Sequence, residues 1–144
     1  MSSVTSQAIL SLLYRDLGPA SETLGRLIGD LSETLPEEDL SGQIEEDITK
    51  LEEEALAFQT DVKEWCGGPY KGQRDSFEGY MRHSRHEVRN RLNHLFGVIQ
   101  LVQMMPPTPA FAEKCVEIVT ALESCLSFVA GTSRAANPHF SPRR

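Results

Sequence analysis

The chain has 144 residues, the length of one domain, and its 40% hydrophobic and 24% charged residues are ordinary for a globular protein. No uninterrupted apolar run approaches the roughly 20 residues that cross a bilayer, so we predict no membrane partner. The N-terminus lacks a basic segment followed by an apolar core, which is the pattern of a secretory signal peptide. The three cysteines are odd in number and show no CxxC spacing. A reducing, cytoplasmic setting is therefore expected.

Charge is unevenly distributed along the chain, whose net charge is −7. Residues 1–61 hold three basic and fourteen acidic side chains, and the rest of the chain holds eleven basic and seven acidic ones. Four arginines crowd around His86: Arg82, Arg85, Arg89 and Arg91. Such a group attracts a phosphate or an acidic partner surface, although a solvated helix face has the same composition. Because the chain is acidic and the basic group small, we expect no nucleic-acid partner.

A first helix is predicted to begin near Thr5 or Ser6, either of which could cap it, and to continue to about Leu31. Gly18-Pro19 lies inside it and should kink the helix rather than end it, because the apolar stripe continues beyond the proline. The inward positions recur at spacings of three, four and seven. They are Ile9, Leu10, Leu13, Leu17, Leu24, Leu27, Ile28 and Leu31.

A second helix is predicted after the turn at residues 35–39, from about Leu40 to Glu64, with a thick acidic outer face. Its predicted inward residues are Ile44, Ile48, Leu51, Leu56 and Phe58. Residues 66–72, with three glycines and a proline, form the clearest break in the chain and predict a connecting loop. Around that loop, aromatic side chains are expected to pack the end of the structure: Trp65, Tyr70, Phe77 and Tyr80.

The second half repeats this organisation. Asp75 or Ser76 can cap a third helix that runs to about Met105. After a proline-rich turn, Thr108 followed by Pro109 is a good start for a fourth helix, which should end near Ala130. Cys115 and Cys125 fall in its apolar pattern and are predicted to be small core residues.

These elements predict an all-α fold. One helical hairpin cannot bury its apolar stripe alone, but two hairpins packed together make an antiparallel four-helix bundle. We assign residues 1–66 to the first hairpin, 67–75 to the connecting loop, 76–130 to the second hairpin and 131–144 to a flexible C-terminal linker.

The two halves align without a gap when the chain is shifted by 71 residues. Leu17 then matches Val88 and Leu24 matches Leu95, and the same shift superimposes the two turns. Any two amphipathic hairpins of like length share part of this pattern, so a duplication is an interpretation. The alignment puts Arg15 at the place of His86, so the first hairpin lacks the histidine.

The second hairpin carries a run of chemistry-bearing residues, His86-Glu87-Val88-Arg89-Asn90-Arg91-Leu92. It resembles the H-box of the dimerisation and histidine-phosphotransfer domain of bacterial sensor histidine kinases. Six of seven positions match, and the departure is Arg91, where the commonest subfamily has proline. The resemblance implies a pseudo-dimeric bundle in one chain and a role in two-component signalling.

The resemblance also implies residue roles. His86 would accept the phosphoryl group, Glu87 would take or hold the proton of the other ring nitrogen, and Asn90 would position water. A histidine side chain in water is largely neutral at pH 7, and Asn90 lies one helical turn beyond His86, so these roles are geometrically possible. The partner would be a response-regulator receiver domain or the ATP-binding domain of a histidine kinase, with Arg82, Arg85, Arg89 and Arg91 assisting the docking.

Other interpretations are open. His86 could be an ordinary exposed residue, or a relic in a non-catalytic dimerisation and signalling bundle that regulates a C-terminal output domain of a larger protein. His83 and His86 have the spacing of a metal pair, but no Glu-x-x-His motif supports it, and we predict no metal. No glycine-rich phosphate loop occurs, so we predict no cofactor and no stand-alone kinase. A homodimer is possible.

Overall fold

The computed structural model describes residues 3–35, 42–72, 76–104 and 106–136. Within this part of the chain all regular structure is helical, which confirms the all-α prediction. A single 3-10 turn, Ser32–Thr34, follows the first helix. The four helices are α1 (Ser3–Leu31), α2 (Gln43–Cys66), α3 (Phe77–Gln103) and α4 (Pro109–Ala136).

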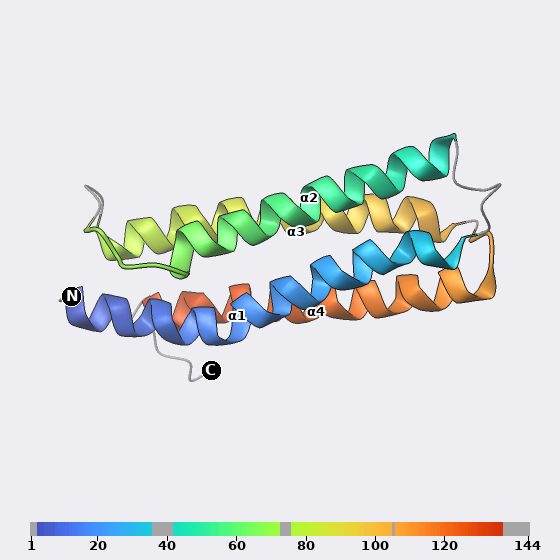
Figure 1. Ribbon diagram of the computed structural model, residues 1–144. Coiled ribbons are helices and arrows are strands. Elements are labelled where there is room, and N and C mark those ends of the chain that lie inside the picture. The colour runs from blue at the N-terminus through green and yellow to red at the C-terminus, as the bar shows by residue number, and fades with distance from the viewer. Residues whose placement is uncertain (1–2, 36–41, 73–75, 105, 137–144) are drawn as a thin grey trace, which may run out of the picture.

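The helices form an antiparallel four-helix bundle, as predicted (Figure 1). Consecutive helices run in opposite directions, and α1 also packs beside α4, which closes the bundle. α1 and α3 therefore lie diagonally across the core, as do α2 and α4. The start of α3 lies at the same end of the bundle as the start of α1 and the end of α4, and His86 lies toward that end.

The core follows from a strict spacing of apolar residues. In α2 and α4 the buried positions recur at alternating intervals of three and four, an average of 3.5 residues that keeps one seam of each helix facing its neighbours. α4 shows the pattern without interruption. Its buried apolar residues are Phe111, Cys115, Ile118, Leu122, Cys125 and Val129.

The aligned halves share their burial pattern. Leu17 and Val88 are both buried, as are Leu24 and Leu95, and Leu51 and Leu122. α1 and α3 thus present matching stripes from opposite corners of the bundle. The similarity is what a duplicated hairpin requires, and the duplication itself stays a prediction.

Leu56 is a wrong prediction of the core. It is 65% exposed on α2, whereas Ala55 beside it is buried. Ala55 lies four residues after Leu51 and three before Phe58, so it occupies the seam position. Leu56 is about 100° further round the helix and faces solvent.

Several predicted boundaries differ from the structure. α1 already includes Ser3, so Thr5 and Ser6 lie inside the helix and do not cap it. α1 continues through Pro19, as predicted. α2 begins at Gln43, later than expected. α4 extends to Ala136, so the first six residues assigned to the linker are helical, because the amphipathic stripe reaches buried Thr132.

Some predictions fall on residues that the structure does not describe. These are Leu40 and most of the first turn, Asp75 as a cap, Met105, and residues 137–144 of the predicted linker. The other capping predictions are confirmed. The Ser76 hydroxyl accepts a hydrogen bond from the Gly79 amide at 3.0 Å, and the Thr108 hydroxyl accepts one from the Phe111 amide at 3.0 Å.

The loop between the hairpins is tied to the bundle end. The Gln7 side chain of α1 accepts from the Tyr70 amide and donates to the Gly68 carbonyl. Tyr70 packs edge-on against Phe77, with ring centroids 5.2 Å apart. Trp65 is buried and its indole N–H points to the Met81 sulfur at 3.3 Å. The predicted aromatic end packing is therefore confirmed, and it fixes the start of α3.

One helix among the described residues is long and apolar enough to cross a membrane by length and composition alone. It is Pro109–Thr132, within α4. Charged residues such as Glu117 and Glu123 interrupt this stretch, so it is not an unbroken apolar run, and the expected absence of a membrane partner stays a prediction. The same stretch supplies core residues of the bundle, Phe111 and Leu122 among them, and a core helix passes this test as well.

The three thiols predict a loss of stability at alkaline pH. Burial raises the pKa of Cys66 and Cys125 to about 12 and that of Cys115 to about 11, from 9.0. The folded state keeps protons that the unfolded chain loses above pH 9, so the thiols contribute stability that is lost as pH rises from about 9 toward these values. Each such proton changes the free energy of unfolding by roughly 1.4 kcal/mol per pH unit.

Urea unfolding at pH 8 and pH 10 measures this effect. Cys125→Ala should be less stable at pH 8, because it leaves a small cavity, but should lose less stability between the two pH values. An unchanged difference between pH 8 and pH 10 in the variant would contradict the assignment.

Candidate functional site

His86 is exposed on α3. It lies about two and a half turns after Phe77, the first residue of the helix, which belongs to the packed aromatic end of the bundle. The Asn90 amide nitrogen lies 3.4 Å from His86 Nε2, across one helical turn. With that amide N–H as the donor, the proton of a neutral imidazole lies on Nδ1 and the lone pair on Nε2. The structure thus brings together two of the three residues predicted for the chemistry.

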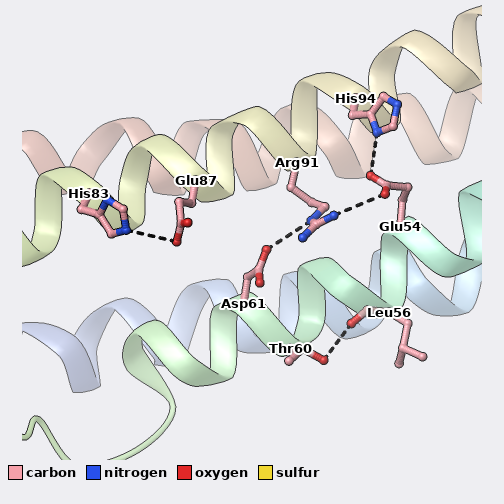
Figure 2. Close-up of polar contacts among 8 residues, drawn as sticks. All are labelled: Glu54, Leu56, Thr60, Asp61, His83, Glu87, Arg91 and His94. Atoms are coloured by element: carbon pink, nitrogen blue, oxygen red, sulfur yellow. Dashed lines mark hydrogen bonds and ion pairs between the residues drawn. The ribbon is translucent and has the colours of Figure 1, made fainter.

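Glu87, the third, points elsewhere. Its Oε1 lies 3.6 Å from His83 Nε2, one turn back along α3 (Figure 2). Both side chains are largely exposed, and ion pairs at such positions contribute at most about 1 kcal/mol. Glu87 is therefore adjacent to His86 in sequence and held by a weak contact to His83.

Arg91 is not available for a docking partner. Its Nε donates to Asp61 Oδ2 at 3.2 Å and its Nη1 donates to Glu54 Oε1 at 3.3 Å, both on α2 (Figure 2). Partial burial is the largest single influence on the pKa of Arg91 and lowers it, but the contacts with Asp61 and Glu54 outweigh it, so the pKa is raised. The predicted docking role of Arg91 is therefore replaced by a link between the two hairpins.

His94 joins the same network. Its Nδ1 lies 2.8 Å from Glu54 Oε2, so one carboxylate of α2 holds both Arg91 and His94 of α3 (Figure 2). Among the described residues, every ion pair between different helices joins α2 to α3. The sequence pattern indicated only an acidic face on α2. Glu54 and Asp61 are seven residues apart, which places them on one side of that helix.

Arg85 is also engaged. Its Nη1 donates to the Thr132 hydroxyl of α4 at 3.3 Å, and its side chain is half-buried. Burial lowers the pKa of Arg85, and the neighbouring charges of Arg89 and Arg82 lower it further.

Arg82 and Arg89 are exposed, and no hydrogen bond or ion pair joins either of them to another described residue. Only these two of the four arginines are free to meet a partner.

Two open depressions lie on the surface of α3 next to His86 and Asn90. One is lined by Ser76, Gly79, Arg82, His83 and His86. The other is lined by Glu54, Asp61, Glu87, Asn90, Arg91 and His94. His86 therefore lines a basic hollow, and Asn90, one turn later, lines a largely acidic one. No group of three or more metal-ligating side chains occurs in the part of the chain that is described.

The first hairpin offers no equivalent chemistry. Arg15 and Asp16, aligned with His86 and Glu87, are exposed on α1. Tyr14 packs so closely against Gly18 that an added Cβ there would lie 3.0 Å from its ring, and it packs equally closely at Gly67. A side chain at Gly18 would require the Tyr14 ring to shift slightly, and one at Gly67 would also lie 2.9 Å from the Lys63 Cα, closer than the backbone allows.

A pair of small hollows, each of about 190 Å³, marks the equivalent grooves of the two halves. The groove between α2 and α3 is lined largely by polar groups, Asp61, His83, Ser84 and Glu87 among them. The 71-residue shift matches these residues to Thr132, Leu12, Leu13 and Asp16, all of which line the other hollow. The groove between α1 and α4 is therefore mainly apolar, although Asp16 and Thr132 line it, whereas the groove beside His86 is mainly polar.

Arg91→Gln is expected to lower the free energy of unfolding by about 1–2 kcal/mol, because the pairs are part-buried and two carboxylates of α2 lose their common partner. Chemical denaturation of parent and variant measures the change, which should shrink in 1 M salt. Arg89→Gln removes the same charge from an exposed site and should leave stability unchanged. Equal losses in both variants would contradict a specific network.

No family model, curated protein or solved structure is significantly similar to this chain.

Proposed function

We propose that the bundle is a histidine phosphoacceptor of two-component signalling, with His86 as the acceptor. The observation that supports this most directly is the exposed His86 ring, whose Nε2 faces the Asn90 amide and which has a free arginine on either side along α3. The bundle architecture agrees with the family that the His86–Leu92 run resembles.

The chemistry requires an accessible lone pair and a route for one proton. Nε2 attacks the phosphorus of an acyl phosphate, the N–P bond forms, and the bond between phosphorus and the carboxylate oxygen of the donor breaks. The Nδ1 proton then leaves the ring. The Asn90 contact is long, so the amide releases Nε2 at little cost and remains one turn away, where it can orient water afterwards.

Glu87 is the proposed proton acceptor. It follows His86 directly, and its present contact with His83 is between two exposed side chains, so it breaks readily. The ionised carboxylate accepts the proton from Nδ1, directly or through one water.

The proposed partner is an acidic receiver domain or the ATP-binding domain of a histidine kinase, met in the cytoplasm. Arg82 and Arg89 are its contact residues, because Arg85 and Arg91 are occupied within the bundle. The first hairpin has Arg15 at the position aligned with His86 and so lacks an acceptor, and each bundle therefore carries one phosphoryl group.

A transfer assay tests the proposal. The purified bundle is mixed with receiver domains phosphorylated on aspartate, or with ATP and histidine kinase catalytic domains, all from the same organism. Phosphate on the bundle that is lost in acid and stable in base supports a phosphohistidine. A folded bundle that takes label from none of these donors would overturn the proposal.

A second candidate function is a non-catalytic signalling bundle that regulates an output domain. The contacts of Arg85, Arg91 and Glu87 favour it, because each of these site residues is engaged within the bundle. It predicts no transfer from any donor, and an altered output activity when the α2–α3 network is removed by Arg91→Gln.

A further inference from the structure

Arg82 has no structural task in the bundle. It is exposed, and no hydrogen bond or ion pair joins it to another described residue. Arginine carries a large rotamer entropy and a planar fork of donors suited to phosphate oxygens. Its neighbours Arg85 and Arg91, by contrast, have defined partners on α4 and α2. The structure thus separates the arginines that build the bundle from those that face solvent.

The position of Arg82 relative to His86 is fixed by the helix. The two are four residues apart, so their Cβ atoms lie about 6 Å apart on one face of α3. Both line the same open depression, together with His83. The guanidinium of Arg82 can therefore reach a group bound at the His86 ring.

The local charge around this depression is largely positive. Arg82, Arg85 and Arg89 lie within two turns, and the charges of Arg82 and Arg89 lower the pKa of Arg85. Two acids are near: Glu78 lies one turn before Arg82 on α3 without an ion pair to any described residue, and Glu87 contacts His83. An anion that enters the hollow meets the free guanidinium of Arg82, which lines it.

We propose that Arg82 binds the non-transferred oxygens of the phosphoryl group at His86. The inference rests on the proposed phosphoacceptor function and deepens it, because it names a phosphate subsite one turn before the acceptor, outside the H-box-like run. Arg82 would donate to two phosphoryl oxygens, which orients the phosphorus for in-line attack by Nε2 and balances the charge that develops on those oxygens.

Transfer kinetics test this role. The donor is a receiver domain phosphorylated on aspartate, at subsaturating and saturating concentrations. Arg82→Gln should lower the saturating transfer rate roughly 10- to 100-fold, in addition to any rise in the half-saturating concentration from the lost docking contact. Arg82→Lys, which keeps the charge, should recover much of the rate. Arg26→Gln, the same substitution at an exposed site of α1, should transfer like the parent. An unchanged saturating rate in Arg82→Gln, or a change confined to half-saturation, would overturn this role.

A binding measurement separates failure of this inference from failure of the proposed function. Inorganic phosphate is titrated into the His86→Gln bundle while the backbone amide signals of Gly79 and His83, which line the same depression, are followed by NMR. A saturable shift that Arg82→Gln abolishes supports the subsite even if no donor labels the parent. No shift, together with full transfer by Arg82→Gln, would discard the subsite and leave His86 as the acceptor.

Discussion

His86→Gln is expected to abolish phosphoryl labelling of the bundle by every donor that labels the parent. Glutamine has no ring nitrogen that can form the N–P bond, so the loss should be complete rather than partial. Because His86 is exposed and its one described contact is the long one to Asn90, the variant should fold normally. Glutamine is also a better helix former than histidine. The measurement is retention of acid-labile, base-stable phosphate.

Two other histidines on α3 are the matched controls. His83 and His94 lie within eight residues of His86, and each pairs with a carboxylate, Glu87 and Glu54 respectively. His83→Gln and His94→Gln should both keep the label. If His86→Gln retains label and either control loses it, the acceptor has been assigned to the wrong histidine.

Leu51→Ala is expected to lower the free energy of unfolding by roughly 3 kcal/mol, within a range of about 2–5 kcal/mol for buried leucines. Leu51 is fully buried in α2, so the substitution removes apolar contacts and leaves a cavity that the rigid helices cannot close. For a chain of this length the midpoint of thermal unfolding should fall by roughly 10 °C. Thermal and chemical unfolding followed by circular dichroism measure both quantities.

Leu56→Ala is the matched control, with the same substitution on the same helix. Leu56 is exposed, and surface substitutions are usually within about 0.5 kcal/mol of the parent. The two variants thus test the orientation of α2 directly. Comparable losses from both would show that the helix is rotated relative to the described core.

The pattern of the sequence was sufficient for most of the helical framework. Thr108 before Pro109 predicted the start of α4, and the Phe111 amide does donate to the Thr108 hydroxyl. Ser76 predicted the start of α3 in the same way. These features are local: a hydroxyl three residues before a free amide acts within one turn, so no distant part of the chain changes it.

Apolar identity alone was less reliable than spacing. Leu56 was placed in the core because leucine is apolar, whereas Ala55 holds the seam between Leu51 and Phe58. Alanine is too small to stand out by its hydrophobicity. Its spacing does identify it, because Ala55 lies four residues after Leu51 and three before Phe58. Likewise, Thr5 and Ser6 were predicted to cap the start of α1 because they are polar, but the helix already includes Ser3.

The sequence pattern of α3 does not reveal which of the four arginines near His86 have partners on other helices. All are within ten residues, and the sequence assigned all of them to a partner. Packing divides them: Arg85 turns to Thr132 on α4, Arg91 bridges Glu54 and Asp61 on α2, and Arg82 and Arg89 stay in solvent. Which partner an arginine meets depends on the helix that lies opposite it, whose contacting residues are at least 30 positions away in the chain.

The sequence by itself determined the helices, the bundle and the histidine with its amide one turn later, because helical periodicity and capping are interactions over a few residues. Only the tertiary structure decided which side chains at that histidine are free. An ion pair across two helices depends on their rotation and axial position, which are set by the packing of the whole core. That packing joins the hairpins through Arg91 and leaves His86 open between Arg82 and Arg89.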